Sequence, residues 1–324
     1  MEIKSIIQEI VKDRQKKGGI HSIYFVACGG SLASFYPAKV FVEIESKKLR
    51  CGWYNSGEFI HNPPAGLGEN SVVIVASHRG NTPETIQAAK TARKAGSPVI
   101  ALTWIPDSEI SKNCDYLLGY TYGDDKDIAG EKTMVGLKLA VELVHQIEGY
   151  KHYEKFYDGV SKIDAIVKKA CKQVEKRAEA FAENYKNENL IYTIGSGPSW
   201  GSAYIECICI LMEMQWINSS CINSGEYFHG PFEITDANTV FMIQIAEGKT
   251  RPVDERALKF LKQYAKRYEV LDAKELGLSV IDADVIDYFN HSLFNNVFNV
   301  YNHKLADARQ HPLTTRRYMW KVEY

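Results

Sequence analysis

The stretch Ser71–Lys94, SVVIVASHRGNTPETIQAAKTARK, contains a complete strand–loop–helix unit. Ser71–Ser77 is a continuous, β-branched apolar run, which is typical of a strand buried on both faces. Pro83–Lys94 has helical composition, and Thr82 and Pro83 are the residue types favoured at a helix N-terminus. A buried strand that leads directly into a helix predicts a parallel sheet covered by helices.

The same alternation continues on either side of this unit. The segment IYFVACGGS, Ile23–Ser31, is an apolar run that ends in glycines, and a helical pattern follows it over 32–45. Further strands are predicted at 52–54 and 99–103, and a further helix at 133–146. Strands that alternate with helices indicate a parallel sheet with helices on both faces.

The sequence is internally duplicated. NSGEFIHNP at Asn55–Pro63 aligns with NSGEYFHGP at Asn223–Pro231, which is a shift from 55 to 223, or 168 residues. At the same shift Gly80 aligns with a glycine and Thr82 with a threonine. Within Ile23–Ser31, the Ile-Tyr pair, the first glycine and the serine also align with identical residues. The expected fold is therefore α/β, with two tandem domains that are each a flavodoxin-like three-layer α/β/α sandwich. We place them at 1–150 and 151–324, the second beginning with a helical connector over 153–186.

Composition excludes several classes of protein. The 324 residues are 45% hydrophobic and 24% charged, with a net charge of −1 and no long block of like charge. A general electrostatic footprint for nucleic acid or an anionic membrane is absent. No run of 18 apolar residues predicts a membrane span, and the N-terminal segment lacks the apolar core of a signal peptide. The seven cysteines form no C-x-x-C pair, so we expect reduced thiols in a cytoplasmic protein.

Two glycine-containing turns at the ends of predicted strands are candidate phosphate sites. Ligands of open parallel sheets bind beyond the carboxyl ends of the strands. Glycine allows the backbone to approach an anion, and the N–H groups at a helix N-terminus attract it. Hydroxyl groups and an arginine would add donors. The candidate residues are Gly29, Gly30, Ser31, Ser77, Arg79 and Thr82.

The second copy carries different chemistry. Its counterpart of the second turn, Ile245–Thr250, lacks the serine hydroxyl and contains a carboxylate, which makes a poorer anion cradle. Glu213 lies in an apolar helical run, where burial would raise its pKa and suit it as a base for a weakly acidic C–H. His229 follows in a loop with glycine and proline. The first-copy counterparts are Glu45 and His61, so the residues alone leave open which copy performs catalysis.

These motifs together resemble the sugar isomerase (SIS) double-domain family. The stretches CGGS, SHRGNT, LMEMQW, GEYFHGP and the C-terminal HPLTTRRYMWKVEY carry the resemblance, which covers essentially the whole chain. Within the family, the sequence is most similar to fructosamine 6-phosphate deglycases of the fructoselysine type. It is also similar to the isomerase half of glucosamine-6-phosphate synthase.

The resemblance implies roles for named residues. It implies phosphate binding by Ser31, Ser77, Arg79 and Thr82, a base at Glu213 and a ring-opening histidine at His229. In relatives this histidine comes from the neighbouring subunit, so the resemblance implies a homodimer with its active site at the subunit interface. A tail lysine of the synthase falls near Arg317, with Lys321 close by in the sequence.

The implied activity is cleavage of an Amadori product, such as fructoselysine 6-phosphate, to glucose 6-phosphate and free amine. The expected partner is this small sugar phosphate, and no cofactor or metal is expected. Two alternatives remain open. An aldose–ketose or amino-sugar phosphate isomerase would use the same acid–base pair without releasing amine, and a sugar-phosphate sensor would bind without turnover.

Overall fold

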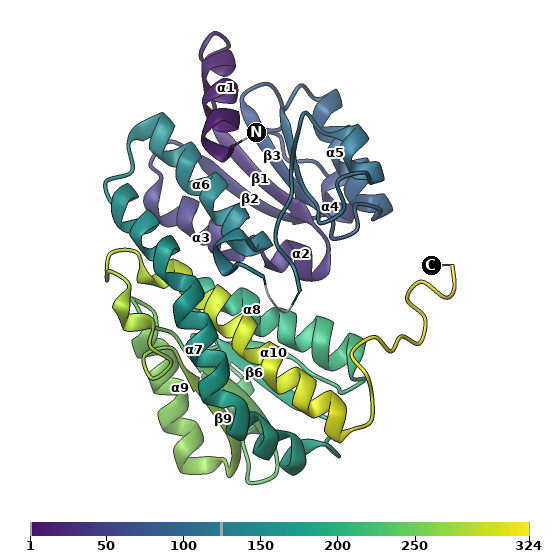
Figure 1. Cartoon of the computed structure of the whole chain (residues 1–324), viewed down its shortest axis with the longest axis vertical. Helices are drawn as coiled ribbons and strands as arrows, with labels where there is room; N and C mark the ends of the chain where they lie inside the picture. The colour runs from purple at the N-terminus through teal and green to yellow at the C-terminus, as the bar shows by residue number, and fades with distance from the viewer. Residues whose placement is uncertain (1, 124–125, 324) are drawn as a thin grey trace. The chain divides into compact units, whose positions relative to one another are not determined.

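A computed structural model describes residues 2–123 and 126–323 of the chain. The chain divides into two compact units, Met1–Tyr157 (unit 1) and Asp158–Tyr324 (unit 2). Each unit contains one parallel β-sheet with helices on both faces (Figure 1). The expected α/β class is confirmed.

The sheet of unit 1 has the strand order β2-β1-β3-β4-β5, and all of its neighbouring strands are parallel. This is the flavodoxin-like order, in which the chain reverses its direction of winding next to β1 and β3. The strands β1, β3 and β4 are buried along their whole length, which explains their continuous apolar sequences. The strands are β1 (Ser22–Ala27), β2 (Arg50–Asn55), β3 (Ser71–Ala76), β4 (Val99–Leu102) and β5 (Tyr116–Leu118).

Helices cover both faces of this sheet. α4 (Ser56–His61) and α5 (Pro83–Lys94) pack on one face against a core of alternate strand residues. The other face is covered by α3 (Tyr36–Glu45) and α6 (Lys132–Glu148), with α1 (Ile3–Gln15) packed against α6 (Figure 1). The short α2 (Gly29–Ala33) and the turns η1 (Glu109–Asn113) and η2 (Ile128–Gly130) lie between these elements along the chain.

Unit 2 repeats this plan with the order β7-β6-β8-β9. Its strands are β6 (Ile191–Gly195), β7 (Cys221–Asn223), β8 (Val240–Ile245) and β9 (Arg267–Asp272). α9 (Arg251–Tyr264) packs on one face, where its apolar residues join those of β8. The remaining elements include α7 (Tyr153–Tyr185), α8 (Trp200–Ile205), α10 (Asn290–Ala308), the π-helix η4 (Glu206–Met214) and the 3-10 turns η3 (Gly197–Ser199), η5 (Pro231–Ile234), η6 (Leu278–Val280) and η7 (Ile286–Phe289).

The structure modifies several expected elements. The helix expected over 32–45 is divided into α2 and α3, and β5 was not expected from the sequence. The apolar residues of α10 face the interior, since Leu293, Val297 and Tyr301 are buried. All seven cysteines are free. No helix in the described ranges has the length and hydropathy needed to span a membrane.

Candidate active site

The loop between β3 and α5 is shaped as an anion cradle. Gly80 has a φ of +71°, and a Cβ atom added there would lie 1.8 Å from Ser108 Oγ, so only glycine fits without a shift. Ser77 is buried, and its Oγ lies 2.9 Å from Thr82 Oγ1. Thr82 N–H also donates to Ser77 Oγ at 3.3 Å. Two predicted site residues, Ser77 and Thr82, thus lie together at the N-terminus of α5, where the helix dipole favours an anion.

The loop after β1 adds a lysine that the sequence interpretation left out of the site. Gly29, with φ +52°, opens α2, and Gly30 and Ser31 follow it. Lys132, the first residue of α6, donates from Nζ to Ser31 Oγ at 2.9 Å. The strands β1 and β3 are neighbours in the sheet, so their two loops leave the same edge. In the sequence, Lys132 is a single basic residue at the start of a helix, and no motif of fixed spacing connects it with Ser31.

The pKa of His78 shows that the electrostatic potential at this edge is positive. Burial, followed by the charges of Lys132 and Arg79, lowers the pKa of His78 to about 4. The imidazole is therefore neutral at physiological pH. The two cations that lower this pKa are the same side chains that would stabilise a bound phosphate. Arg79 itself is exposed beside the loop.

The matching loop of unit 2 is filled by the chain's own side chains. Asp287 Oδ1 accepts from Lys249 N at 2.8 Å, and Asp254 Oδ2 accepts from Ala246 N at 3.0 Å. Asn290 Oδ1 accepts from Glu247 N at 2.8 Å. Gly248, with φ +130°, approaches Asp287 so closely that an added Cβ would lie 2.5 Å from the carboxylate. Internal carboxylates and an amide thus take the N–H groups that an anion would need.

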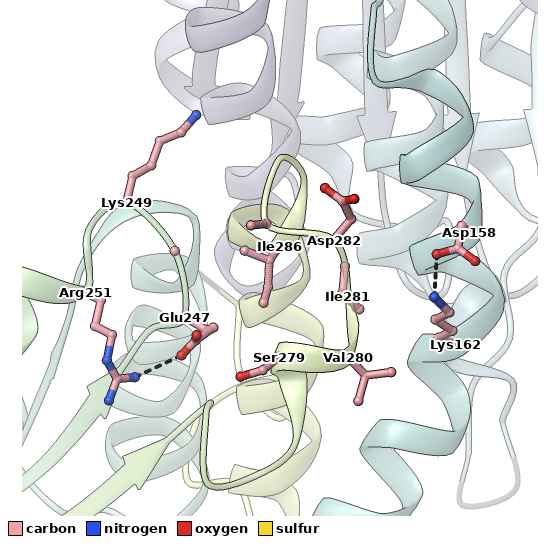
Figure 2. A pocket seen from close by; sticks show the side chains of 12 residues that line it. Asp158, Lys162, Glu247, Lys249, Arg251, Ser279, Val280, Ile281, Asp282 and Ile286 are labelled. Atoms are coloured by element: carbon pink, nitrogen blue, oxygen red, sulfur yellow. Dashed lines mark hydrogen bonds and ion pairs between the residues drawn. The ribbon is translucent and has the colours of Figure 1, made fainter.

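A cavity of about 690 Å³ lies beside this filled loop in unit 2 (Figure 2). Four of its charged side chains form two ion pairs with one another. Arg251 Nη1 lies 3.2 Å from Glu247, and Lys162 Nζ lies 2.5 Å from Asp158, as the dashed lines in Figure 2 mark. Arg251 also forms two hydrogen bonds with Asp272. The paired charges make this cavity a weaker candidate for a phosphate than the loops of unit 1.

Glu213 lies in the π-helix Glu206–Met214, which the helical pattern did not predict. A π-helix closes wider turns than an α-helix, and such segments are frequent at functional sites. Burial raises the pKa of Glu213, and an ion pair with Arg316 opposes this rise. The Arg316 Nη2–Glu213 Oε1 distance is 2.8 Å, and the arginine side chain is only 9% exposed. The result is a partly buried carboxylate held in one orientation by a buried cation.

The C-terminal tail is anchored to the end of this π-helix. Gln215 Nε2 donates to the His311 carbonyl at 2.8 Å, and the Arg317 guanidinium lies 4.2 Å from the Trp216 ring centroid. Lys321 Nζ donates to the carbonyl of Arg316 at 2.6 Å. The sequence interpretation named Arg317 and Lys321, whereas the residue that contacts Glu213 is Arg316. A substrate-binding role for Arg317 and Lys321 stays a prediction.

His229 is exposed in the loop between β7 and η5. Its backbone N–H donates to the Glu226 carbonyl at 2.9 Å, and Gly230 follows with φ +133°. Buried Tyr227 fixes the base of the loop through its hydroxyl, 2.5 Å from Thr235 Oγ1. Within the part of the chain that the structure describes, no hydrogen bond or ion pair joins His229 to Glu213.

The described residues contain no group of three or more histidine, cysteine, aspartate and glutamate side chains arranged to hold a metal ion. The geometry of the unit 1 loops is suited to binding an anion, and the partly buried Glu213 of unit 2 is suited to proton transfer.

Residues 19–136 match the family model of the SIS domain. The chain is 42% identical to fructosamine deglycase FrlB of Bacillus subtilis over 323 residues, which cover 100% of the chain and 97% of that protein. It is 27% identical to the fructoselysine 6-phosphate deglycase of Escherichia coli K12, over 85% of the chain and 78% of that protein. The crystal structure of a Salmonella typhimurium LT2 protein described as a phosphosugar isomerase superimposes with a TM-score of 0.96. That protein is 45% identical, with 100% of this chain and 98% of the other covered.

The identity to these proteins extends over both units, and the two parallel sheets agree with the superimposed structure. The chain therefore belongs to the SIS-domain family and is an enzyme of the deglycase and sugar-phosphate isomerase type.

Proposed function

We propose that the protein is a cytoplasmic deglycase that converts a fructosamine 6-phosphate to glucose 6-phosphate and a free amine. The observation that carries the proposal is Glu213, a partly buried carboxylate with a raised pKa that is oriented by Arg316. Ser77, Thr82, Ser31 and Lys132 supply donors for the 6-phosphate. The 42% identity to a fructosamine deglycase supports the same reaction class.

The reaction needs one base and no redox step. Glu213 removes a proton from C1, which is acidified by the adjacent C2 carbonyl, while the C2 oxygen gains a proton to form an enaminol. A proton returned to C2 forms a C–H bond there and leaves a protonated imine between C1 and the amine nitrogen. Water adds to this C=N bond, the C–N bond breaks, and the open-chain aldehyde of glucose 6-phosphate leaves with the amine.

His229 is proposed to open the sugar ring by transferring a proton between the ring oxygen and the C2 hydroxyl. Its exposure, and the absence of a described hydrogen bond or ion pair to Glu213, suit a side chain that serves the active site of a second copy. We therefore propose a homodimer in which each site takes Glu213 from one subunit and the histidine from the other.

The test of the reaction is a coupled assay for glucose 6-phosphate with ε-fructoselysine 6-phosphate as substrate. We expect glucose 6-phosphate to form together with free lysine, and Glu213→Gln to lower this turnover by about 10²–10⁴-fold. The matched control is Glu206→Gln on the same π-helix. Burial raises the pKa of Glu206 to about 8, so this carboxyl is already neutral at pH 7 and accepts a hydrogen bond from Asn302 that glutamine can also accept.

Other outcomes would refute the proposal. Turnover of fructose 6-phosphate without any release of amine from the Amadori substrate would identify an isomerase instead. Tight binding of both sugar phosphates without turnover would identify a sensor. Near wild-type turnover by Glu213→Gln would remove Glu213 as the base.

Mixed dimers test the shared site. Glu213→Gln and His229→Ala chains are each expected to be inactive alone. A heterodimer of the two contains one site with both intact residues if those residues come from different subunits, so mixing restores activity. Mixtures that remain inactive, although exchange is shown by mass, would place both residues of each site on one chain.

A further inference from the structure

A group of aromatic side chains lies directly beyond the phosphate-binding loop of unit 1. The His78 ring stacks on Trp104, with centroids 5.3 Å apart and planes at 4°. Tyr122 meets His78 edge-on at 4.4 Å and Trp104 at 5.5 Å. We call these three residues, with the supporting Tyr120, the aromatic cluster. Trp104 is 46% exposed and Tyr122 is 60% exposed, so two large rings present open surface.

Hydrogen bonds to the ends of β3 and β4 support the aromatic cluster. The backbone N–H of Trp104 donates to the His78 carbonyl at 3.0 Å, which connects the ends of β3 and β4. Buried Tyr120 places its hydroxyl 2.8 Å from His78 Nδ1. Thr103 Oγ1 bonds the same His78 carbonyl at 3.3 Å. The His78 ring and the backbone of Trp104 are therefore held at the ends of β3 and β4, which favours recognition of a ligand over a flexible surface contact.

The surface of the aromatic cluster is uncharged. The low pKa of His78, caused by burial and by Lys132 and Arg79, keeps its imidazole neutral at physiological pH. A neutral face of aromatic rings binds carbon chains and aromatic groups by apolar contact. Exposure of this apolar face to water is unfavourable when no ligand covers it. Lys132 donates to the Ser31 hydroxyl, on the side of the aromatic cluster that Tyr120 occupies. A cation and exposed apolar rings thus lie next to one another.

The aromatic cluster and the anion cradle are adjacent along the chain. His78 is the residue after Ser77, and Lys132 lies 5.5 Å from the Tyr120 ring centroid while it bonds Ser31. A ligand anchored by its phosphate at Ser77 and Thr82 therefore has these rings beside its anchoring loop. An isomerase substrate ends at C1, whereas a fructosamine continues through nitrogen into a substituent.

We infer that the aromatic cluster is the subsite for the substituent on the amine nitrogen, and that it selects substituents with an extended carbon chain, such as the side chain of lysine. This inference rests on the proposed function. The methylene chain packs on Trp104 and Tyr122, and the polar end of the amino acid remains in water. The subsite supplies binding only and takes no part in proton transfer.

The test compares two substrates with the same phosphosugar. One is ε-fructoselysine 6-phosphate, and the other is fructosamine 6-phosphate with only hydrogen on its nitrogen. In Trp104→Ala and Tyr122→Ala, kcat/KM for the lysine derivative should fall roughly tenfold relative to the short substrate, since an aromatic contact of this kind contributes on that scale. Trp104→Phe should restore most of the ratio. The ratio is independent of the fraction of folded enzyme.

The control variant is Tyr264→Ala, which removes an aromatic ring of similar exposure, 49%, from α9 of unit 2. Its ratio should match wild type. Equal losses on both substrates in Trp104→Ala would overturn the subsite while leaving the proposed function intact. An unchanged ratio with a change in oligomeric mass would overturn it in favour of a protein interface. Wild-type inactivity on both substrates would refute the proposed function, and the subsite with it.

Discussion

Replacing Gly80 with alanine tests how tightly the loop after β3 is packed. The change forces a side chain onto a residue at φ +71° and drives a Cβ to 1.8 Å from Ser108 Oγ and 2.3 Å from Ser108 Cβ. Ser108 is buried, so it has little room to move. The same N–H groups that the loop presents to phosphate would have to shift with it.

The expected cost follows from three effects. A left-handed backbone costs alanine about 1–2 kcal/mol relative to glycine. Relieving the overlap with Ser108 costs about 1–3 kcal/mol, as for other overpacked sites. Loss of glycine's freedom in the unfolded chain returns about 0.4–1 kcal/mol. We expect a net destabilisation of about 1–5 kcal/mol, with a fall in Tm of roughly 2–4 °C for each kcal/mol.

Two controls separate backbone strain from collision. Gly149 also has positive φ, +76°, but an added Cβ there meets nothing within 4 Å, so Gly149→Ala reports strain alone. In a Ser108→Gly background both overlapping atoms of residue 108 are gone, and the next nearest atom is Ile110 Cγ2 at 3.2 Å. Gly80→Ala should then cost much less than in the presence of Ser108, and close to the cost of Gly149→Ala. Urea denaturation measures each variant, and calorimetry measures its affinity for glucose 6-phosphate. If Gly80→Ala were as stable and as tight-binding as wild type in the presence of Ser108, the close approach of Gly80 to Ser108 would be refuted.

Three further predictions concern charge. Arg316→Met removes the cation that lowers the pKa of Glu213, so that this pKa rises under the effect of burial. The acidic limb of the kcat/KM–pH profile should therefore move to higher pH. Arg317→Met, which removes an arginine that contacts Trp216 instead, should leave that limb in place. His78 has a folded-state pKa of about 4, below its ordinary value of 6.5, so the unfolded chain binds more protons between these values and stability falls as pH drops through this window. Urea titrations at pH 7 and pH 5 should show a smaller fall for His78→Gln, and an equal fall would remove His78 as its source. Calorimetric titration with glucose 6-phosphate should give one site per chain because Asp287 fills the loop of unit 2, and two sites would contradict that assignment.

The parts of the fold that local sequence specifies were predictable. Pro83–Lys94 was expected as a helix with these bounds, because a capping residue and proline define its start. β5 was missed because it has only three residues, Tyr116–Leu118, and no alternating pattern. The π-helix at Glu206–Met214 was not foreseeable, since its apolar sequence fits an α-helix equally well.

The site was predictable where residues act through their own turn. Ser77 and Thr82 bond each other across five positions of one loop, so the turn chemistry alone brings them together. Lys132 and Arg316 reach the site through tertiary contacts with Ser31 and Glu213, which no spacing in the sequence reveals. The choice between Arg316 and Arg317 depends on the conformation of an irregular tail, where adjacent side chains point in different directions.

The carboxylate of Asp287 behaves as a ligand that never dissociates. It is joined covalently to the loop that it fills, so its effective concentration is fixed by the chain and does not vary with metabolite levels. The conformation of this loop of unit 2 therefore does not depend on the concentration of sugar phosphate. Under the proposed function, the open cradle of unit 1 gains stability by mass action as its ligand accumulates. One copy of the duplicated domain then has a self-sufficient loop, and the other has a loop whose folding free energy depends on the substrate supply.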